Sequence, residues 1–114
     1  MTRPLGRAMT LVALCLPTGA AAELSVSTVR YGCERGVEIA ASYVNADTGG
    51  AAVLQVEGRQ VALLLAPSAS GARYAWPSDG SGYVWWTKGN EATLLWREAG
   101  GAETILYAAC VPLD

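Results

Sequence analysis

The sequence contains no histidine and no phenylalanine, and its 114 residues include only three cysteines. Without an imidazole, neither a Ser–His–Asp triad nor a Cys–His pair can form, which excludes the common routes to nucleophilic catalysis. The acidic residues are scattered, and no two of them are placed for glycoside chemistry. A Ser70–Lys88 dyad remains, but its lysine would have to be buried, and Lys88 beside Gly89 is expected to be exposed. We therefore predict that the chain is not an enzyme.

A long hydrophobic run is also missing. The longest one, residues 8–16, is shorter than the roughly 20 residues that a membrane-spanning helix needs. It follows two arginines and precedes three alanines that end at Ala22, which is the order of a secretory signal peptide. We predict that residues 1–22 are this leader and that residues 23–114 form one mature domain. Cys15 does not directly follow small residues, so lipid anchoring is not expected and we predict a periplasmic protein.

Charge is low as well. Arg3 and Arg7 leave with the predicted leader, so the mature chain keeps six basic and ten acidic residues. A mildly acidic domain has no electrostatic reason to bind nucleic acid or an anionic membrane, whereas a basic protein partner would suit it. Two distant thiols without histidine supply only half of a zinc shell. We predict no metal, no cofactor and no nucleic-acid partner.

Two cysteines remain in the mature chain, Cys33 and Cys110, near its opposite ends. Exported proteins fold in an oxidising compartment, where such a pair is expected to form a disulfide. The bond would close a loop of about eighty residues, for which the chain-entropy model gives roughly 4–5 kcal/mol of stabilisation. This is a large contribution in a domain so small.

The mature chain alternates short strand patterns with clusters of turn residues, and it shows no amphipathic helix. The expected strands are residues 24–31, 37–44, 52–56, 60–65, 72–76, 83–87, 91–97 and 103–109. Residues 45–50 and 77–82 are expected to be loops. Short strands at this spacing are typical of a closed barrel or a sandwich, and closure removes exposed strand edges. We predict an all-β protein: a closed antiparallel barrel of about eight strands, with the disulfide joining the two ends of the sheet.

The tryptophans and tyrosines must replace phenylalanine in the core. Trp85 and Trp86 are adjacent in an expected strand, so their side chains must point to opposite faces, one toward the core and one outward. The same alternation applies to Arg73 and Tyr74, and Tyr74 is the better core residue. A barrel of this size is either filled by side chains or has room for one small ligand.

Two motifs carry a resemblance to a known family. They are Ser70-Gly71-Ala72-Arg73-Tyr74 and Trp86-Thr87-Lys88-Gly89-Asn90-Glu91-Ala92, accompanied by Tyr31-Gly32-Cys33, Tyr43 and the late Cys110. Together they resemble the inhibitors of c-type lysozyme known as MliC and PliC. The resemblance covers essentially the whole mature chain.

The resemblance implies an eight-stranded barrel that blocks c-type lysozyme by inserting a loop into the active-site cleft. By this resemblance the inserted serine is Ser70 and the motif lysine is Lys88. The residues expected to bind the partner are Ser70, Gly71, Ala72, Arg73, Tyr74, Lys88, Gly89 and Glu91. Lysozyme uses one protonated and one ionised carboxyl group, and a serine hydroxyl can hydrogen-bond to either form. A lysine ammonium adds a charge-assisted hydrogen bond, so the inhibitor needs no chemistry of its own.

Other interpretations remain open. Each motif residue has a simpler structural role in a turn, a strand or an ion pair, such as Glu91 with Lys88 or Arg73. A small-ligand or sugar-binding barrel would use Trp76, Trp85 and Trp96 as its aromatic walls, and a third possibility is a purely structural envelope domain. Residues 75–84 form a longer segment than the family leads us to expect. They would either add contacts to the partner or obstruct its docking.

Overall fold

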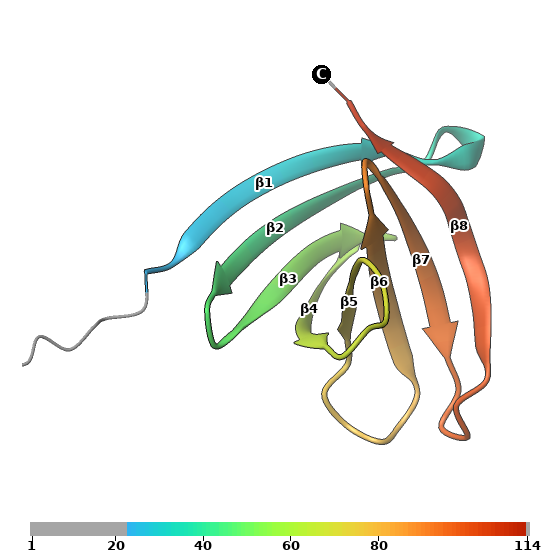
Figure 1. Ribbon diagram of the computed structural model, residues 1–114. Coiled ribbons are helices and arrows are strands. Elements are labelled where there is room, and N and C mark those ends of the chain that lie inside the picture. The colour runs from blue at the N-terminus through green and yellow to red at the C-terminus, as the bar shows by residue number, and fades with distance from the viewer. Residues whose placement is uncertain (1–22, 114) are drawn as a thin grey trace, which may run out of the picture.

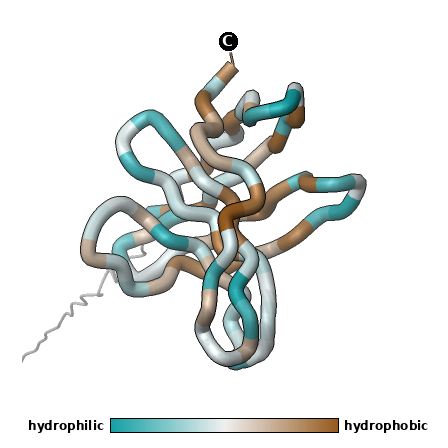
Figure 2. Tube along the Cα trace, turned by 90° about the vertical axis from the view of Figure 1, so that its right-hand side faces the viewer, coloured by the Kyte–Doolittle hydropathy of each residue, from teal (hydrophilic) through white to brown (hydrophobic). Residues whose placement is uncertain are grey.

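The computed structural model describes residues 23–113, so the expected leader and Cys15 lie outside the described part of the chain. Eight strands follow one another (Figure 1): β1 (Ser25–Gly32), β2 (Glu38–Ala46), β3 (Gly49–Val56), β4 (Arg59–Ala66), β5 (Ala72–Ala75), β6 (Gly82–Lys88), β7 (Glu91–Arg97) and β8 (Glu103–Pro112). A single turn of 3-10 helix, η1 (Glu34–Gly36), joins β1 to β2. Hydrophilic residues collect at the tips of the hairpins (Figure 2).

Each strand pairs antiparallel with the next, and β8 returns to β1, so the sheet closes in the order β1 to β8. This confirms the predicted closed antiparallel barrel. The expected loop at residues 45–50 is wrong in extent, because the ladder pairs Asn45 with Gly50 and Ala46 with Gly49. Only Asp47 and Thr48 are left as a two-residue turn. Continued backbone pairing therefore extends both strands beyond their hydrophobic pattern.

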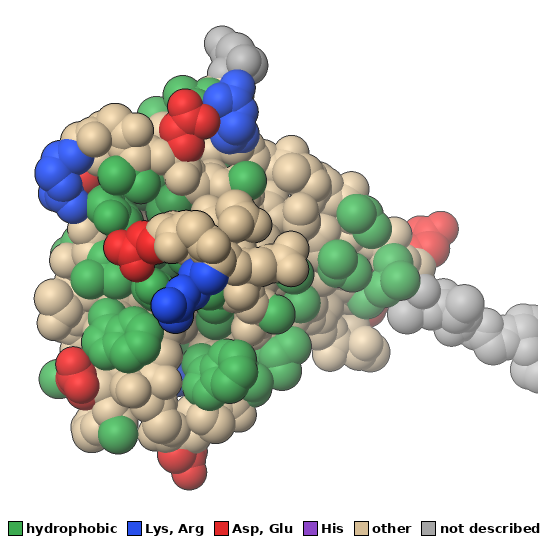
Figure 3. Space-filling model, turned by 180° about the vertical axis from the view of Figure 1, so that it is seen from behind, with side chains coloured by type: hydrophobic (Ala, Val, Ile, Leu, Met, Phe, Trp, Pro, Cys, Tyr) green, Lys and Arg blue, Asp and Glu red, His purple; other side chains and the backbone are tan. Residues whose placement is uncertain are grey.

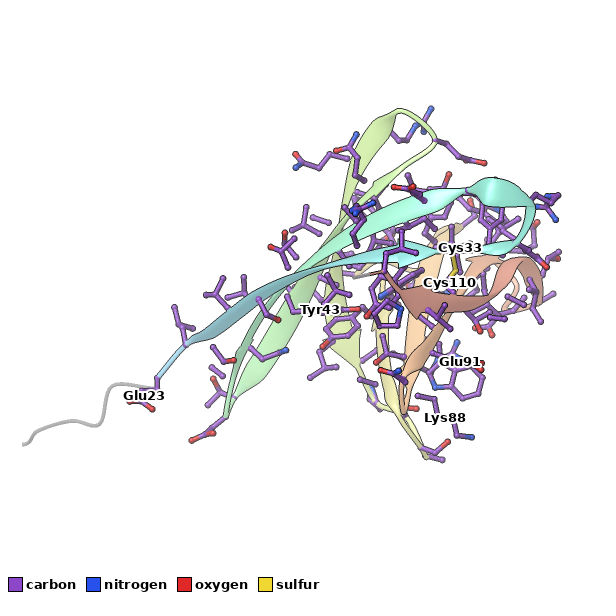
Figure 4. All side chains as sticks on the ribbon, turned by 90° about the horizontal axis from the view of Figure 1, so that it is seen from above. Glu23, Cys33, Tyr43, Lys88, Glu91 and Cys110 are labelled. Carbon is purple, nitrogen blue, oxygen red and sulfur yellow. A yellow bond between two sulfur atoms is a disulfide. The ribbon has the colours of Figure 1, made fainter. Side chains whose placement is uncertain are left out.

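The barrel closes along a short seam between β1 and β8. Within residues 23–113, the register between these strands contains two pairs, Tyr31 with Pro112 and Gly32 with Val111. The disulfide between Cys33 and Cys110 lies directly beside them, with a Cα–Cα distance of 4.1 Å (Figure 4). The predicted pairing is thus confirmed. Cys110 lies inside β8 rather than after it, because this strand shifts register near Leu94 and goes on to reach β1.

Side chains fill the barrel interior. The buried residues of this main core are Tyr31, Ile39, Ala41, Ala52, Leu54, Val56, Leu63, Tyr74, Trp85, Ala92, Leu94 and Cys110. Trp85 is fully buried, packs edge-on against Tyr31 at 5.1 Å, and donates its Nε1–H to the Tyr43 hydroxyl at 2.8 Å. Burial raises the pKa of Tyr43 far above its ordinary value. Tryptophan thus takes the place of phenylalanine in this core, and the hydrogen bond from its indole N–H to Tyr43 fixes its position.

Strand alternation also creates a second, outer cluster. Ala75, Val84 and Leu95 are buried on the face opposite the interior, with Trp86 packed against them. The prediction that Trp85 and Trp86 face opposite sides is confirmed. Elsewhere the outer surface mixes exposed hydrophobic and charged side chains (Figure 3). No helix within residues 23–113 is long and apolar enough to cross a membrane.

Candidate functional site

The two sequence motifs meet at one end of the barrel. Residues 67–71 connect β4 to β5, and Gly89 and Asn90 connect β6 to β7. Gly71 has a φ of 67°, and a Cβ atom there would lie 2.3 Å from the Thr87 carbonyl oxygen. Only glycine allows this backbone to approach β6 so closely in such a conformation. The β4–β5 loop is therefore packed directly against the end of β6, and we call residues 67–71 and 88–91 together the loop rim.

Trp86 connects the two parts of the loop rim. Its Nε1–H donates to the Ser70 carbonyl oxygen at 3.0 Å, which fixes the backbone of the exposed serine. The Lys88 Nζ lies 5.5 Å and the Arg73 Cζ 5.2 Å from the centre of the Trp86 ring. Both distances suit a cation–π interaction, which orients the cations without neutralising them. Ser70 and Lys88 are thus held on one side of the molecule by a shared indole.

Arg73 has a second partner within the chain. Its guanidinium forms an ion pair with the Glu103 carboxylate, and both side chains are mostly covered, with 21% and 28% of their surfaces exposed. Arg73 belongs to β5 and Glu103 to β8, so the pair reaches across β6 and β7 beside the outer cluster. A half-buried, charge-assisted contact of this kind stabilises the sheet locally. Arg73 therefore stabilises β5, the strand that directly follows residues 67–71 of the loop rim.

The β6–β7 hairpin carries Lys88 and Glu91 as a directly opposed pair at its tip (Figure 4). Gly89 has a φ of 61°, as the first position of a tight two-residue hairpin turn requires. Lys88, Gly89 and Glu91 are all exposed. Within residues 23–113, Glu91 takes part in no ion pair, so the pairing with Lys88 or Arg73 considered above is not present.

Tyr74 lies inside the barrel, as its place in the strand pattern predicts, with 4% of its surface exposed. Its hydroxyl donates to the Asn45 Oδ1 at 3.3 Å. Both residues line a hollow of about 260 Å³, which also reaches Tyr43, Thr87 and Gly89 and opens beside the loop rim. Ala72 is half-buried beneath the same rim. Of the residues predicted to bind a partner, five are exposed: Ser70, Gly71, Lys88, Gly89 and Glu91. Tyr74 is buried in the barrel, so its side chain is not available to a partner surface.

The geometry gives little support to catalysis. Lys88 is exposed, so the Ser70–Lys88 pair lacks the buried lysine that a dyad requires. Within the described part of the chain, no three His, Cys, Asp or Glu side chains are grouped to hold a metal ion. The loop rim can therefore offer a hydroxyl, an ammonium group and backbone amides to a partner surface.

The small-ligand interpretation placed three tryptophans on one aromatic wall, and this is wrong. Trp85 is fully buried in the main core, whereas Trp76 is 44% exposed and lies with Trp96 at a separate surface hollow. The long segment between the motifs connects β5 to β6 at the end of these strands opposite the loop rim (Figure 1). It therefore does not lie in the path of a partner that docks on the rim.

Several polar contacts, at the loop rim and at the other end of the barrel, escaped the sequence pattern. Glu103 holds Arg73, Asn45 holds Tyr74, and the Glu57 carboxylate accepts hydrogen bonds from the hydroxyls of Tyr83 and Tyr107. Burial, together with the neighbouring Glu57 carboxylate, raises the pKa of Tyr83. Each pair joins residues far apart in sequence, so only the arrangement of the closed barrel could reveal it.

The fold and the rim define a small, disulfide-closed, up-and-down barrel that displays polar loops instead of enclosing a catalytic cleft. A family model described as membrane-bound lysozyme inhibitor of c-type lysozyme matches residues 31–103, which include both motifs. The chain belongs to this family, MliC. The resemblance seen in the sequence is thus confirmed. The family is one of inhibitors, in agreement with the prediction that the chain is not an enzyme.

Two curated relatives share the family's description. A membrane-bound lysozyme inhibitor of C-type lysozyme from Cupriavidus necator is 45% identical over 69 residues, covering 60% of this chain and 52% of the relative. A protein of the same description from Pseudomonas aeruginosa is 38% identical over 84 residues, covering 73% of this chain and 63% of the relative. The chain thus spans between half and two thirds of the length of these relatives.

Two solved structures share the fold. Pseudomonas aeruginosa MliC, crystallised in complex with hen egg white lysozyme, superposes with a TM-score of 0.63 at 30% identity. The match covers 94% of this chain and 100% of that one. PliC from Salmonella typhimurium, a periplasmic lysozyme inhibitor, superposes with a TM-score of 0.65 at 24% identity, covering 79% of this chain and 100% of that one. The second likeness concerns the fold alone.

Proposed function

We propose that this chain inhibits c-type lysozyme by placing Ser70 and Lys88 in the active-site cleft of the enzyme. One observation carries the proposal: Gly71 packs on Thr87, and Trp86 holds the Ser70 backbone, so two separate loops form one rigid exposed rim. A rim ordered before binding loses little conformational entropy when it docks. Family membership and the lysozyme complex of the Pseudomonas aeruginosa protein support the choice of partner.

The chemistry of the rim suits the two carboxyl groups of lysozyme. The Ser70 hydroxyl donates to the ionised group or accepts from the protonated one, since it carries one donor and two acceptor lone pairs. The Lys88 ammonium lies over the Trp86 ring without an acidic partner within the described residues, so its charge is available to a carboxylate. In a cleft without water, such a charge-assisted contact is stronger than on the surface. The rim therefore occupies the sugar site and neutralises the catalytic charge.

Arg73 and Tyr74 have a supporting part in this proposal. Their side chains already contact Glu103 and Asn45, respectively, so they hold β5 and the loop before it in place. Gly89 and Glu91 lie at the exposed tip beside Lys88 and would contact lysozyme outside its catalytic centre. The mildly acidic charge of the mature chain favours approach to a basic enzyme.

The proposal is tested by titrating lysozyme with the native chain and with Ser70→Ala and Lys88→Ala. Losing one partner of a desolvated charged contact costs about 2–5 kcal/mol, so inhibition should weaken by roughly 30-fold or more. Matched controls are Ser81→Ala in the β5–β6 loop and Arg30→Ala, whose exposed pair with Glu38 contributes little stability. Unchanged inhibition by a folded Ser70→Ala/Lys88→Ala double variant would refute these site residues while leaving the family intact.

We also propose that the chain acts in the bacterial envelope as an exported, unlipidated protein. The order of residues 1–22 supports export, and the poor acylation context of Cys15 supports release from the membrane. Mass spectrometry of the protein from a periplasmic extract should give a mature chain that begins at Glu23. A mass that includes an acyl chain would contradict this.

A further inference from the structure

A second hollow lies at the other end of the barrel strands. Its volume is about 270 Å³, and its walls include Trp76, Tyr83 and Trp96, with Arg59 and Gln60 at the edge. Trp76 follows β5, Tyr83 is the second residue of β6 and Trp96 is near the end of β7, whereas the loop rim comes from the opposite ends of the same strands. Figure 1 shows the β5–β6 loop and the β6–β7 hairpin at opposite ends of β6. We call this feature the aromatic hollow.

Trp76 is held firmly although 44% of its surface is exposed. Its backbone N–H donates to the Tyr83 carbonyl oxygen at 3.4 Å, and its own carbonyl accepts from the Arg97 Nη2 at 3.2 Å. A Cβ atom on Gly82 would lie 2.5 Å from the Trp76 Cβ, so the absence of a side chain at Gly82 lets the tryptophan pack there. The Trp76 backbone is therefore fixed by hydrogen bonds and its side chain packs on Gly82, while much of the indole stays open to a partner.

The other walls add a shaped floor and polar edges. Tyr83 and Trp96 pack edge to face with ring centres 5.1 Å apart, and the Tyr83 hydroxyl donates to Glu57 at 2.9 Å. Arg59 and Gln60 also line the hollow, and both are exposed residues whose side chains carry hydrogen-bonding groups, a guanidinium and an amide. An aromatic surface bordered by hydrogen-bonding groups is the usual composition of a small-ligand site.

We propose that the aromatic hollow binds a saccharide, with one sugar ring stacked on Trp76 and its hydroxyl or amide groups hydrogen-bonded to Gln60 and Arg59. A sugar ring presents a face of C–H groups, which the negative face of an indole attracts, and a polar edge, which amide and guanidinium groups satisfy. The hollow is smaller than the roughly 300–1,000 Å³ of drug-sized sites, which favours one ring over a longer buried chain. Its position leaves the loop rim free, so both surfaces can be occupied together.

The test titrates the mature native chain, without lysozyme, with N,N′-diacetylchitobiose while the indole N–H signals are followed by NMR. We expect saturable shifts of the Trp76 and Trp96 signals, with the Trp86 signal unchanged. Trp76→Leu keeps an apolar side chain but removes the stacking face, and it should weaken binding roughly tenfold. Trp86→Leu, a matched loss of an indole at the other end, should bind the disaccharide like the native chain.

A second variant guards against a loss of folding. Gln60→Ala changes an exposed side chain, so it should leave the thermal midpoint unchanged and weaken binding severalfold. Trp76→Leu should also keep full inhibition of lysozyme, which separates this proposal from that of the loop rim. The proposal is overturned by the absence of saturable shifts, by equal binding to folded Trp76→Leu, or by binding of toluene in place of the disaccharide.

Discussion

Replacing Cys33 and Cys110 by alanine should open the barrel at the seam between β1 and β8. This seam contains two register pairs within the described chain, whereas β1 and β2 are joined by eight. A hydrogen bond from the Leu113 N–H to the Arg30 carbonyl oxygen, at 2.7 Å, extends this closure. The disulfide therefore holds together strands that have few other contacts.

The magnitude follows from the separation of the two cysteines. They are 77 residues apart in sequence, and a loop of this length corresponds to about 4.5 kcal/mol of lost entropy in the unfolded chain. Each kcal/mol shifts the thermal midpoint of a domain of this size by roughly 4–8 °C. We expect the double alanine variant to melt roughly 20 °C or more below the native chain.

Thermal unfolding followed by circular dichroism measures this difference. Adding a reductant should lower the midpoint of the native chain to that of the variant, and should not affect the variant itself. A decrease smaller than about 4 °C, or less than about 1 kcal/mol, would show that the seam is stable without its covalent link. Barrel closure would then depend on the β1–β8 ladder and not on the disulfide.

Two further predictions concern the site and the core. Gly71→Ala forces a Cβ against the Thr87 carbonyl at a φ of 67°, which costs about 1–3 kcal/mol of strain, and it should weaken lysozyme inhibition by roughly tenfold. The control Gly36→Ala has a φ of 72° but lies in open space, so it should inhibit normally in the same lysis assay. Equal inhibition by both variants would contradict the packing of the loop rim. The pKa of Tyr43 is raised in the folded state, so the protonated hydroxyl contributes its full stabilisation below pH 10. Above that pH the free energy of unfolding should fall by up to about 1.4 kcal/mol per pH unit. Urea unfolding between pH 9 and 12 measures this slope; a slope equally steep in Tyr43→Phe would exclude Tyr43 as its source.

The sequence pattern predicts the strands well because burial in a closed barrel imposes a two-residue alternation on every strand. Tyr74 could therefore be assigned to the interior, and Trp85 and Trp86 to opposite faces, from their positions alone, whereas the structure shows that Trp85 is the inner one. The tight turns are also readable, since Gly58 and Gly89 have the positive φ that their hairpins need. Strands and tight turns can thus be predicted from the sequence, because residues close together in the chain determine them.

Prediction is weaker where distant strands meet. The ladder between β2 and β3 continues through Gly49 and Gly50, which look like loop residues by composition. The Arg73–Glu103 pair crosses two intervening strands, and the register shift in β8 that brings Val111 to β1 leaves no mark in the hydrophobic pattern. Such contacts depend on the tilt and closure of the sheet. The three-tryptophan wall failed for a different reason, because Trp85 is fully buried in the main core while Trp76 is exposed.

By our proposal the loop rim blocks the active site of lysozyme. The most direct measurement is the lysis of a bacterial cell-wall suspension by a c-type lysozyme, titrated with the folded mature chain, residues 23–114. We predict a stoichiometric loss of lytic activity that Lys88→Ala weakens and Arg30→Ala does not. Full lysis at micromolar excess of the folded native chain would show that the rim does not block the enzyme.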